Sequence, residues 1–242
     1  MTDTSDTSEF AALLREMEAY AAEHHVPIIN ENGRKVFLSV IRDLRPHRVL
    51  EIGTAIGYSA LLLAANGAED ARVTTLELSE ERAALARAFI ARSPYAARIE
   101  LLQGDAGELL TKLTGKYDFV FIDAAKGQYV DYFEKVQPLL TEDATIVADN
   151  VLFRGYVMGT EKAPRRYRTI VKRLRQYIEL TSHAAGYTTE IFARGDGLAV
   201  SRRHAAALHG ETPMTSHITP HSPDHLAAHA EEAAAVLDAL HS

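Results

Sequence analysis

The chain has 242 residues, 24% of them charged, with a formal net charge of −7 and no cysteine. This length suits one α/β domain with a sizeable core and leaves no room for a second full domain. The lack of cysteine excludes disulfides, thiolate metal sites and a cysteine nucleophile, and the acidic total argues against a protein that coats nucleic acid through its overall charge.

The beginning of the chain is acidic and polar, without the basic and apolar regions of a signal peptide. The longest purely apolar run, 60–65, is far shorter than the roughly 18 residues that a membrane span needs. We therefore predict a cytoplasmic protein with no membrane partner.

Two helices are predicted before the first strand. Apolar residues follow helical spacing over 9–25, which predicts a first helix that Pro27 terminates. A second helix is predicted over 32–44. These helices form an N-terminal helical cap, residues 1–45. They could cover the sheet, cover a ligand crevice or pair with another subunit, and core cover is favoured.

Strands and helices then alternate over 46–202, which predicts an α/β, doubly wound parallel sheet. The predicted strands are 48–52, 72–77, 98–103, 117–122, 144–148, 188–194 and 198–201, and the predicted helices are 57–66, 79–92, 106–113, 129–140 and 164–181. The last two strands are joined only by the short turn 195–197, which allows only a hairpin. An antiparallel strand should therefore close the sheet.

The final segment, 203–242, is a polar tail that holds seven of the eleven histidines. A helix over 223–240 is predicted, with Ser222 as its N-cap. His225 and His229 are spaced to bind a transition metal, but no regular ligand set is completed, so a functional metal site in the tail is not favoured.

Polar residues follow two of the predicted strands. Asp123 ends the strand 117–122, and Asp149 and Asn150 end the next one. If these strands are neighbours, the three side chains converge as hard oxygen ligands, which suit Mg²⁺ better than zinc. Lys126 could reach the same place. The alternative is that the acids only cap helices and that Lys126 only forms an ion pair.

A glycine loop follows the first strand, in the order Glu51-Ile-Gly53-Thr-Ala-Ile-Gly57. Its spacing is not the G-x-G-x-x-G of dinucleotide binding, and the acid before it suits a cationic ligand. Glu77, after the second strand, is placed to accept both hydroxyls of a ribose, and Asp105, after the third, lies where a nucleobase would be. The predicted cofactor contacts are Glu51, Gly53, Gly57, Tyr58, Ser59, Glu77, Asp105, Ala106 and Asp123.

These motifs resemble the class I S-adenosylmethionine-dependent methyltransferases, and among them the divalent-cation-dependent O-methyltransferases that include the catechol and caffeoyl-CoA enzymes. The resemblance covers about 30–202. It implies a Rossmann-like sheet, S-adenosylmethionine as cofactor, and Mg²⁺ or another divalent cation on Asp123, Asp149 and Asn150. It also implies Lys126 as the catalytic residue that assists deprotonation, and it suggests a homodimer.

The segment 154–175 is strongly basic. It contains eight basic residues and one acidic residue, Glu161, so its local charge is 8 − 1 = +7. Basic side chains that neutralise phosphates are the main source of affinity for nucleic acids. The segment resembles the bacterial tRNA 5-hydroxyuridine methyltransferases, which implies 5-hydroxyuridine at the tRNA wobble position as substrate and 5-methoxyuridine as product. The RNA-binding residues would be Arg154, Arg165, Arg166, Arg168, Lys172 and Arg173.

The alternative substrate is a small catechol or hydroxycinnamoyl compound, for which the basic helix would be only surface. A non-catalytic S-adenosylmethionine-binding or RNA-binding module would leave the Asp-Lys-Asp-Asn set unexplained. The glycine spacing counts against a nicotinamide oxidoreductase.

Overall fold

A computed structural model describes residues 4–159, 162–193 and 195–204. The helix predicted over 223–240, and the histidine pair within it, lie outside this part of the chain. No helix in the described ranges has the length and the apolar character needed to cross a bilayer.

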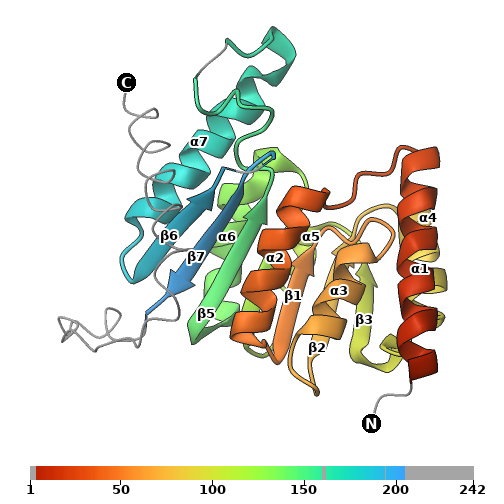
Figure 1. Cartoon of the computed structure of the whole chain (residues 1–242). Helices are drawn as coiled ribbons and strands as arrows, with labels where there is room; N and C mark the ends of the chain where they lie inside the picture. The colour runs from red at the N-terminus through yellow and green to blue at the C-terminus, as the bar shows by residue number, and fades with distance from the viewer. Residues whose placement is uncertain (1–3, 160–161, 194, 205–242) are drawn as a thin grey trace, which may run out of the picture.

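The centre of the fold is a seven-stranded sheet in the order β3-β2-β1-β4-β5-β7-β6 (Figure 1). Strands β1 to β5 pair in parallel, and β7 pairs antiparallel with both β5 and β6. The predicted doubly wound sheet with an antiparallel hairpin is therefore confirmed. The strands are β1 (Arg48–Ile52), β2 (Arg72–Glu77), β3 (Ile99–Gln103), β4 (Tyr117–Ile122), β5 (Leu140–Asp149), β6 (Tyr187–Phe192) and β7 (Leu198–Arg203).

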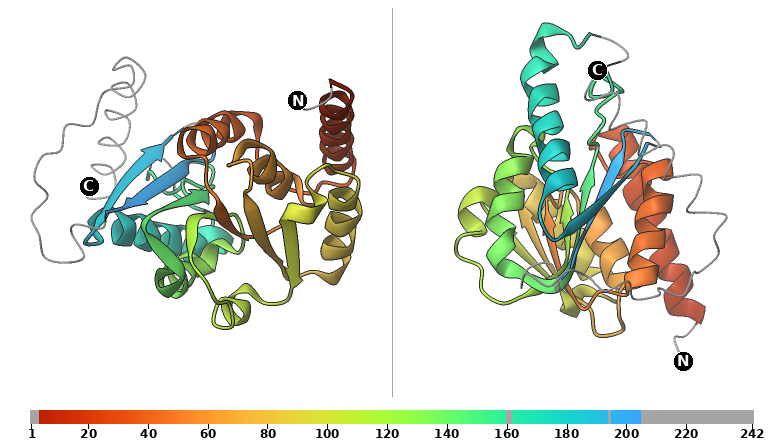
Figure 2. Two further views of the ribbon diagram at one scale, coloured as in Figure 1. Left: turned by 90° about the horizontal axis from the view of Figure 1, so that it is seen from below. Right: turned by 90° about the vertical axis from the view of Figure 1, so that its left-hand side faces the viewer.

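Helices cover both faces of the sheet (Figure 2). The helices are α1 (Thr4–Glu23), α2 (Glu31–Leu44), α3 (Tyr58–Asn66), α4 (Glu80–Ala91), α5 (Ala106–Leu109), α6 (Tyr129–Val136) and α7 (Arg168–His183). Helices α1 to α4 share one apolar core with the sheet, and α5 to α7 share the other. In β1, Val49 faces the first core and Leu50 the second, and both side chains are fully buried. Burial on both faces explains why the strands read as continuous apolar runs.

The predicted N-terminal cap packs on the sheet, since Phe37 of α2 contacts Phe121 of β4 with ring centroids 4.4 Å apart and the rings tilted by 40°. Asn30 caps α2 by accepting a hydrogen bond from the backbone N–H of Gly33 (3.0 Å). Core cover, one of the three roles considered for these helices, is therefore observed.

Some predicted element boundaries were wrong. Helix α1 begins at Thr4, before the predicted start at residue 9. Helix α6 ends at Val136, where a 3₁₀ turn containing Pro138 follows, and β5 begins at Leu140 instead of residue 144. The exposed acids Glu142 and Asp143 interrupt the apolar run, so the first part of this strand carried no strand signal.

The strand order reverses at β1, because the chain adds β2 on one side of β1 and β4 on the other. In parallel α/β sheets, ligands bind at such a reversal, beyond the carboxyl ends of the strands. The topology thus points to the loops that follow β1, β2, β4 and β5.

Candidate cofactor and metal site

A cavity of about 410 Å³ lies at the carboxyl ends of the parallel strands. Each of β1 to β5 contributes to it through the residues that follow the strand. Of the predicted cofactor and metal residues, the cavity wall contains Gly53, Tyr58, Ser59, Glu77, Asp105, Ala106, Asp123, Asp149 and Asn150, and it also contains the predicted catalytic residue Lys126. Most of the predicted site is therefore brought to one place.

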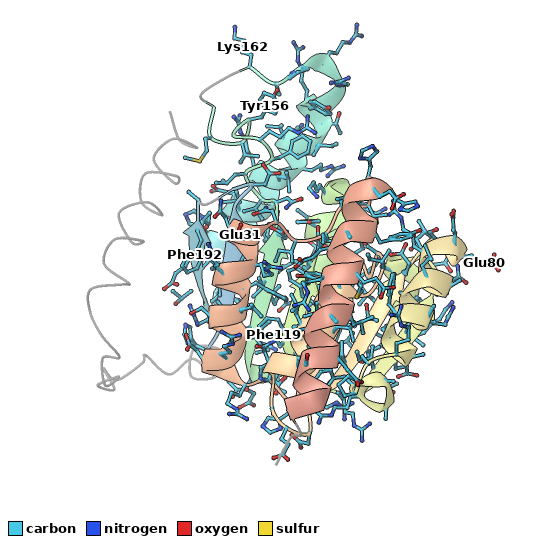
Figure 3. The ribbon with its side chains drawn as sticks, turned by 45° about the vertical axis from the view of Figure 1, so that its right-hand side comes forward. Glu31, Glu80, Phe119, Tyr156, Lys162 and Phe192 are labelled. Atoms are coloured by element: carbon cyan, nitrogen blue, oxygen red, sulfur yellow. The ribbon has the colours of Figure 1, made fainter. Side chains whose placement is uncertain are left out.

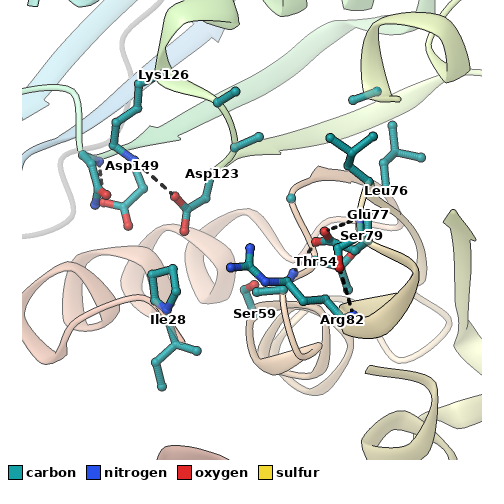
Figure 4. A pocket seen from close by; sticks show the side chains of 18 of the residues that line it. Ile28, Thr54, Ser59, Leu76, Glu77, Ser79, Arg82, Asp123, Lys126 and Asp149 are labelled. Carbon is teal, nitrogen blue, oxygen red and sulfur yellow. Dashed lines mark hydrogen bonds and ion pairs between the residues drawn. The ribbon is translucent and has the colours of Figure 1, made fainter. Parts of the chain in front are cut away.

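Two acidic side chains and a lysine face one another in this cavity (Figure 4). Lys126 Nζ lies 3.9 Å from Asp123 Oδ1, and the two side chains are 19% and 24% exposed. Burial raises the pKa of Asp149, and the nearby Asp123 carboxylate raises it further. Burial also raises the pKa of Asp123, while Lys126 opposes that shift. The pair therefore carries more negative charge than its one ammonium neighbour can compensate.

Asn150 extends this acidic pair with an amide. Its backbone is left-handed (φ +57°), a conformation that asparagine tolerates better than most residues. Its N–H donates to Asp149 Oδ1 (2.7 Å), and the hydroxyl of Tyr129 donates to the carbonyl oxygen of Asp149 (3.0 Å). These contacts hold the end of β5 in place.

The donor chemistry of this set fits a hard divalent cation, because two under-compensated carboxylates and an amide oxygen are typical Mg²⁺ ligands. In the described ranges no group of three or more His, Cys, Asp and Glu residues could hold a metal. A cation here would therefore depend on Asn150 as well as on Asp123 and Asp149.

Gly53 brings the glycine loop against the acidic pair. Its φ is +103°, and an added Cβ would lie 2.1 Å from the carbonyl oxygen of Asp123. The N–H of Asp123 in turn donates to the carbonyl oxygen of Ile52 (2.9 Å). Only glycine allows the two strand ends to approach so closely.

Glu77, the predicted ribose acceptor, lies at the cavity wall. Its Oε2 accepts from the N–H of Ala55 and its Oε1 from the N–H of Ser79, both at 2.9 Å. The two backbone donors fix the carboxylate, which is 7% exposed, at the cavity wall. Each oxygen keeps a second lone pair, so both remain able to accept from a diol. Asp105 is held differently, because its Oδ1 caps α5 by accepting from the N–H of Glu108 (3.1 Å).

Two predicted cofactor residues, Glu51 and Gly57, are not part of the cavity wall. Glu51 is fully buried beneath it, where the hydroxyl of Thr75 donates to Oε2 (2.5 Å). Its Oε1 has no hydrogen-bond partner among the described residues. Burial raises the pKa of Glu51 to about 7; the hydroxyls of Ser59 and Thr75 oppose this shift, and the carboxylates of Asp123 and Glu77 add to it.

The raised pKa of Glu51 predicts a pH-dependent cost to stability. The folded protein binds a proton at Glu51 that the unfolded chain has lost, so stability falls between the unfolded pKa of 4.5 and the folded pKa of about 7. Glu51→Gln removes this cost. The stability of the variant relative to the wild type should therefore increase by up to about 3 kcal/mol between about pH 5 and pH 8.

Urea unfolding of the ligand-free proteins across that pH range measures the effect. The matched control is Glu100→Gln, at an exposed position of β3. A difference between Glu51→Gln and wild type that stays constant with pH would contradict the prediction.

Some cavity residues were not anticipated. Pro27, Ile28 and Ile29, from the linker between α1 and α2, form part of the wall. The sequence around them contains no motif that would have signalled this. Gln128 and Tyr132 of the α6 region also line the cavity, and the hydroxyl of Tyr132 donates to Gln128 Oε1 (2.5 Å).

The predicted RNA-binding residues lie elsewhere. None of the six lines the cavity. Within the described part of the chain, none of the six forms an ion pair. Arg154 and Arg166 stack on the ring of Tyr167, at 5.7 and 4.6 Å from its centroid. Lys162 and Tyr156, from the segment that leads into these residues, lie at the end of the molecule beyond α2 in Figure 3.

This basic surface, the exposed Arg165, Arg166, Arg168, Lys172 and Arg173, follows the outer side of α7 and the turn before it. Arg168, Lys172 and Arg173 line a shallow groove there. The inner side of α7 buries Val171, Leu174 and Ile178, and the helix packs against the Lys126–Gln128 turn. The surface is therefore separate from the cavity but joined to it through the element that carries Lys126.

The chain is similar to known proteins in both sequence and structure. A family model described as O-methyltransferase matches residues 2–204. Caffeoyl-CoA O-methyltransferase 2 of Petunia hybrida is 28% identical over 216 residues, which cover 83% of this chain and 87% of the relative. Catechol O-methyltransferase of Mycobacterium tuberculosis is 39% identical over 117 residues, or 48% and 53% of the two chains. The structure of an O-methyltransferase from Bacillus cereus in complex with SAH superposes with a TM-score of 0.70 at 28% identity, covering 79% of this chain and 90% of that one.

Proposed function

The chain belongs to the O-methyltransferase family and is an S-adenosylmethionine-dependent enzyme; we propose that its acceptor is one hydroxyl of a vicinal pair of oxygens on an aromatic ring, as in a catechol or a hydroxycinnamoyl ester. The observation that carries this proposal is the meeting of Asp123, Asp149, Asn150 and Lys126 in the same cavity as Glu77. Relatives named for catechol and caffeoyl-CoA support the same class of acceptor.

In this proposal Asp123, Asp149 and Asn150 would hold a divalent cation. When bound, such a cation lowers the pKa of an acceptor hydroxyl and fixes its orientation. As an ammonium group, Lys126 would stabilise the oxyanion; as the neutral amine that a nearby cation favours, it would receive the hydroxyl proton. Glu77 would hold the cofactor ribose and so orient the sulfonium methyl group.

The transfer itself is a single displacement. A lone pair of the acceptor oxygen forms the new bond to the methyl carbon, the bond between carbon and sulfur breaks, and sulfur keeps that electron pair. The products are the methyl ether and S-adenosylhomocysteine. Since the protein adds no covalent step, most of the acceleration would come from alignment of oxygen, carbon and sulfur.

A second candidate acceptor is 5-hydroxyuridine in tRNA, and the basic surface favours it. The 5-hydroxyl and the 4-carbonyl of this base form a vicinal oxygen pair comparable to that of a catechol. Guanidinium groups on an exposed surface can neutralise phosphates. Ala124 and Ala125, which line the cavity, are small and leave room for a base carried on a larger substrate.

Methyl transfer from labelled S-adenosylmethionine distinguishes the two acceptors. The substrates are caffeate, caffeoyl-CoA and tRNA carrying 5-hydroxyuridine, each with Mg²⁺ and with EDTA. We expect Mg²⁺-dependent product on a catechol-type acceptor, unchanged in the double variant Arg165→Glu/Arg166→Glu. Absence of product on all acceptors in Mg²⁺ would contradict the proposal.

The RNA candidate predicts another pattern. Product would form on tRNA and would fall in Arg165→Glu/Arg166→Glu, while the control Arg87→Glu, an exposed position on α4, would behave as wild type. The slope of log affinity for tRNA against log salt concentration would also decrease by about one for each phosphate-binding side chain removed. Equal losses in the double variant and the control would assign the basic surface to general electrostatics.

A further inference from the structure

Three side chains from three helices meet beside the cofactor cavity. The hydroxyl of Tyr58 (α3) donates to Glu18 Oε1 (α1) at 2.5 Å. Arg34 Nη1 (α2) donates to the same Glu18 oxygen and to the Tyr58 hydroxyl. We call these three residues the helix latch.

The helix latch is attached directly to the glycine loop. Tyr58 follows Gly57 (φ +89°) as the first residue of α3, and its side chain is both 2% exposed and part of the cavity wall. Burial and the hydrogen bond to Glu18 raise the pKa of Tyr58 to about 12, so the phenol stays protonated and remains a donor. A shift of Glu18 or Arg34 would therefore be transmitted to the wall.

The latch also spans the linker between α1 and α2. Glu18 lies before this linker and Arg34 after it, while Pro27, Ile28 and Ile29 line the cavity between them. In the view of Figure 4, Ile28 lies on the other side of the Asp123 and Asp149 carboxylates from Lys126. The linker therefore forms a wall that faces the strand ends.

Few backbone hydrogen bonds hold this wall. Pro27 is exposed and has no N–H, and the N–H groups of Ile28 and Ile29 make no backbone hydrogen bond with a described residue. Ile29 belongs to the apolar core and Ile28 packs against it, so side-chain packing holds one side of the linker. Because the backbone itself is weakly held, the position of the linker also depends on the anchors at its two ends.

We propose that Glu18 and Arg34 are positioning residues for the cofactor: through Tyr58 they keep the α1–α2 linker in place as a wall of the cavity. The proposal rests on the S-adenosylmethionine-dependent activity but not on the identity of the acceptor. If the latch is broken, a smaller fraction of molecules has the wall in place, and the apparent Kd rises in proportion.

Calorimetric titration with S-adenosylhomocysteine, in the absence of any acceptor, tests this. The variants are Glu18→Gln, Arg34→Met and the milder Tyr58→Phe, which loses only the hydroxyl. The matched control is Glu16→Gln, because Glu16 is on the same helix and binds Arg92 through two contacts (2.7 and 2.5 Å) outside the cavity wall. We expect Kd to rise about fivefold or more in Glu18→Gln and Arg34→Met, in the same direction but less in Tyr58→Phe, and less than about twofold in the control.

Hydrogen exchange of the linker gives a second readout. The amides of His24 and Val26 donate to the carbonyl oxygens of Tyr20 and Ala21, both at 2.9 Å. They should exchange faster in the latch variants than in wild type or Glu16→Gln, and S-adenosylhomocysteine should restore their protection. The exchanged pair Glu18→Arg/Arg34→Glu should recover part of the lost affinity, because it rebuilds the contact with opposite polarity.

Equal Kd values in Glu18→Gln, Arg34→Met and Glu16→Gln would overturn the proposal and leave the latch with a purely structural role. A loss of thermal stability in the latch variants without a change in Kd would do the same. The titration contains no acceptor, so it tests the latch independently of the proposed function. If wild-type protein binds S-adenosylhomocysteine but methylates neither catechols nor tRNA, that result would contradict only the proposed acceptor.

Discussion

Asp149→Asn is expected to lose methyl transfer by at least about a hundredfold, because a catalytic cation supplies several kcal/mol that the variant could no longer recruit fully. The same change should stabilise the ligand-free protein. Asp149 is 2% exposed and lies near a second carboxylate, so the neutral amide removes a buried repulsion. The amide oxygen can still accept the hydrogen bond from the N–H of Asn150.

Lower activity together with higher stability separates this effect from simple misfolding. Turnover in Mg²⁺ and thermal unfolding in EDTA are measured on the same preparation. Asp143→Asn, at an exposed position of the same strand, is the control and should change neither quantity. An Asp149→Asn enzyme with wild-type turnover would remove Asp149 from the proposed metal site.

Gly53→Ala is expected to have the largest effect on the fold. The added Cβ would lie 2.1 Å from the Asp123 carbonyl oxygen and 2.8 Å from its carbon, and both are backbone atoms that cannot rotate away. The left-handed φ of +103° adds strain for any residue other than glycine. We expect a loss of about 3 kcal/mol or more of stability, which corresponds to a fall in Tm of roughly 6–12 °C.

Gly127→Ala is the matched comparison, because a Cβ at Gly127 meets nothing within 4 Å although the residue adjoins Lys126. It should change Tm little and activity moderately at most. Calorimetry and S-adenosylhomocysteine titration of both variants measure the difference. Equal Tm values for the two variants would show that the strand ends separate more easily than their hydrogen bond suggests.

The sequence predicted both of these parts of the site. Asp123 and Asp149 were predicted together because each follows an apolar strand, and parallel strands bring their carboxyl ends to one edge. The glycine loop was predicted because no other residue fits a tight turn from strand to helix. In both cases the signal is local, since it depends on residues adjacent to a strand.

Glu51 shows the limit of such motifs. It occupies the expected place before the glycine loop, yet it lies buried beneath the cavity and not in its wall. A sequence motif identifies the glycine loop, but it does not show which side chains of the motif face the cavity. The pleat of β1 and the packing of neighbouring elements determine which side chains are exposed there. The basic surface shows the same limit, because its charge was evident from the sequence but its distance from the cavity was not.

The sequence by itself thus determined the alternation of strands and helices, the closing hairpin, the family and the grouping of Asp123, Asp149 and Asn150 at one edge of the sheet. Each of these depends on periodicity or on residues that directly follow a strand. Only the tertiary structure decided that the α1–α2 linker walls the cavity and that Glu18, Arg34 and Tyr58 meet. These contacts join residues 16, 24 and 40 positions apart, and no periodic pattern encodes them. They arise because α1 and α2 must bury their apolar faces on the same side of the sheet as α3.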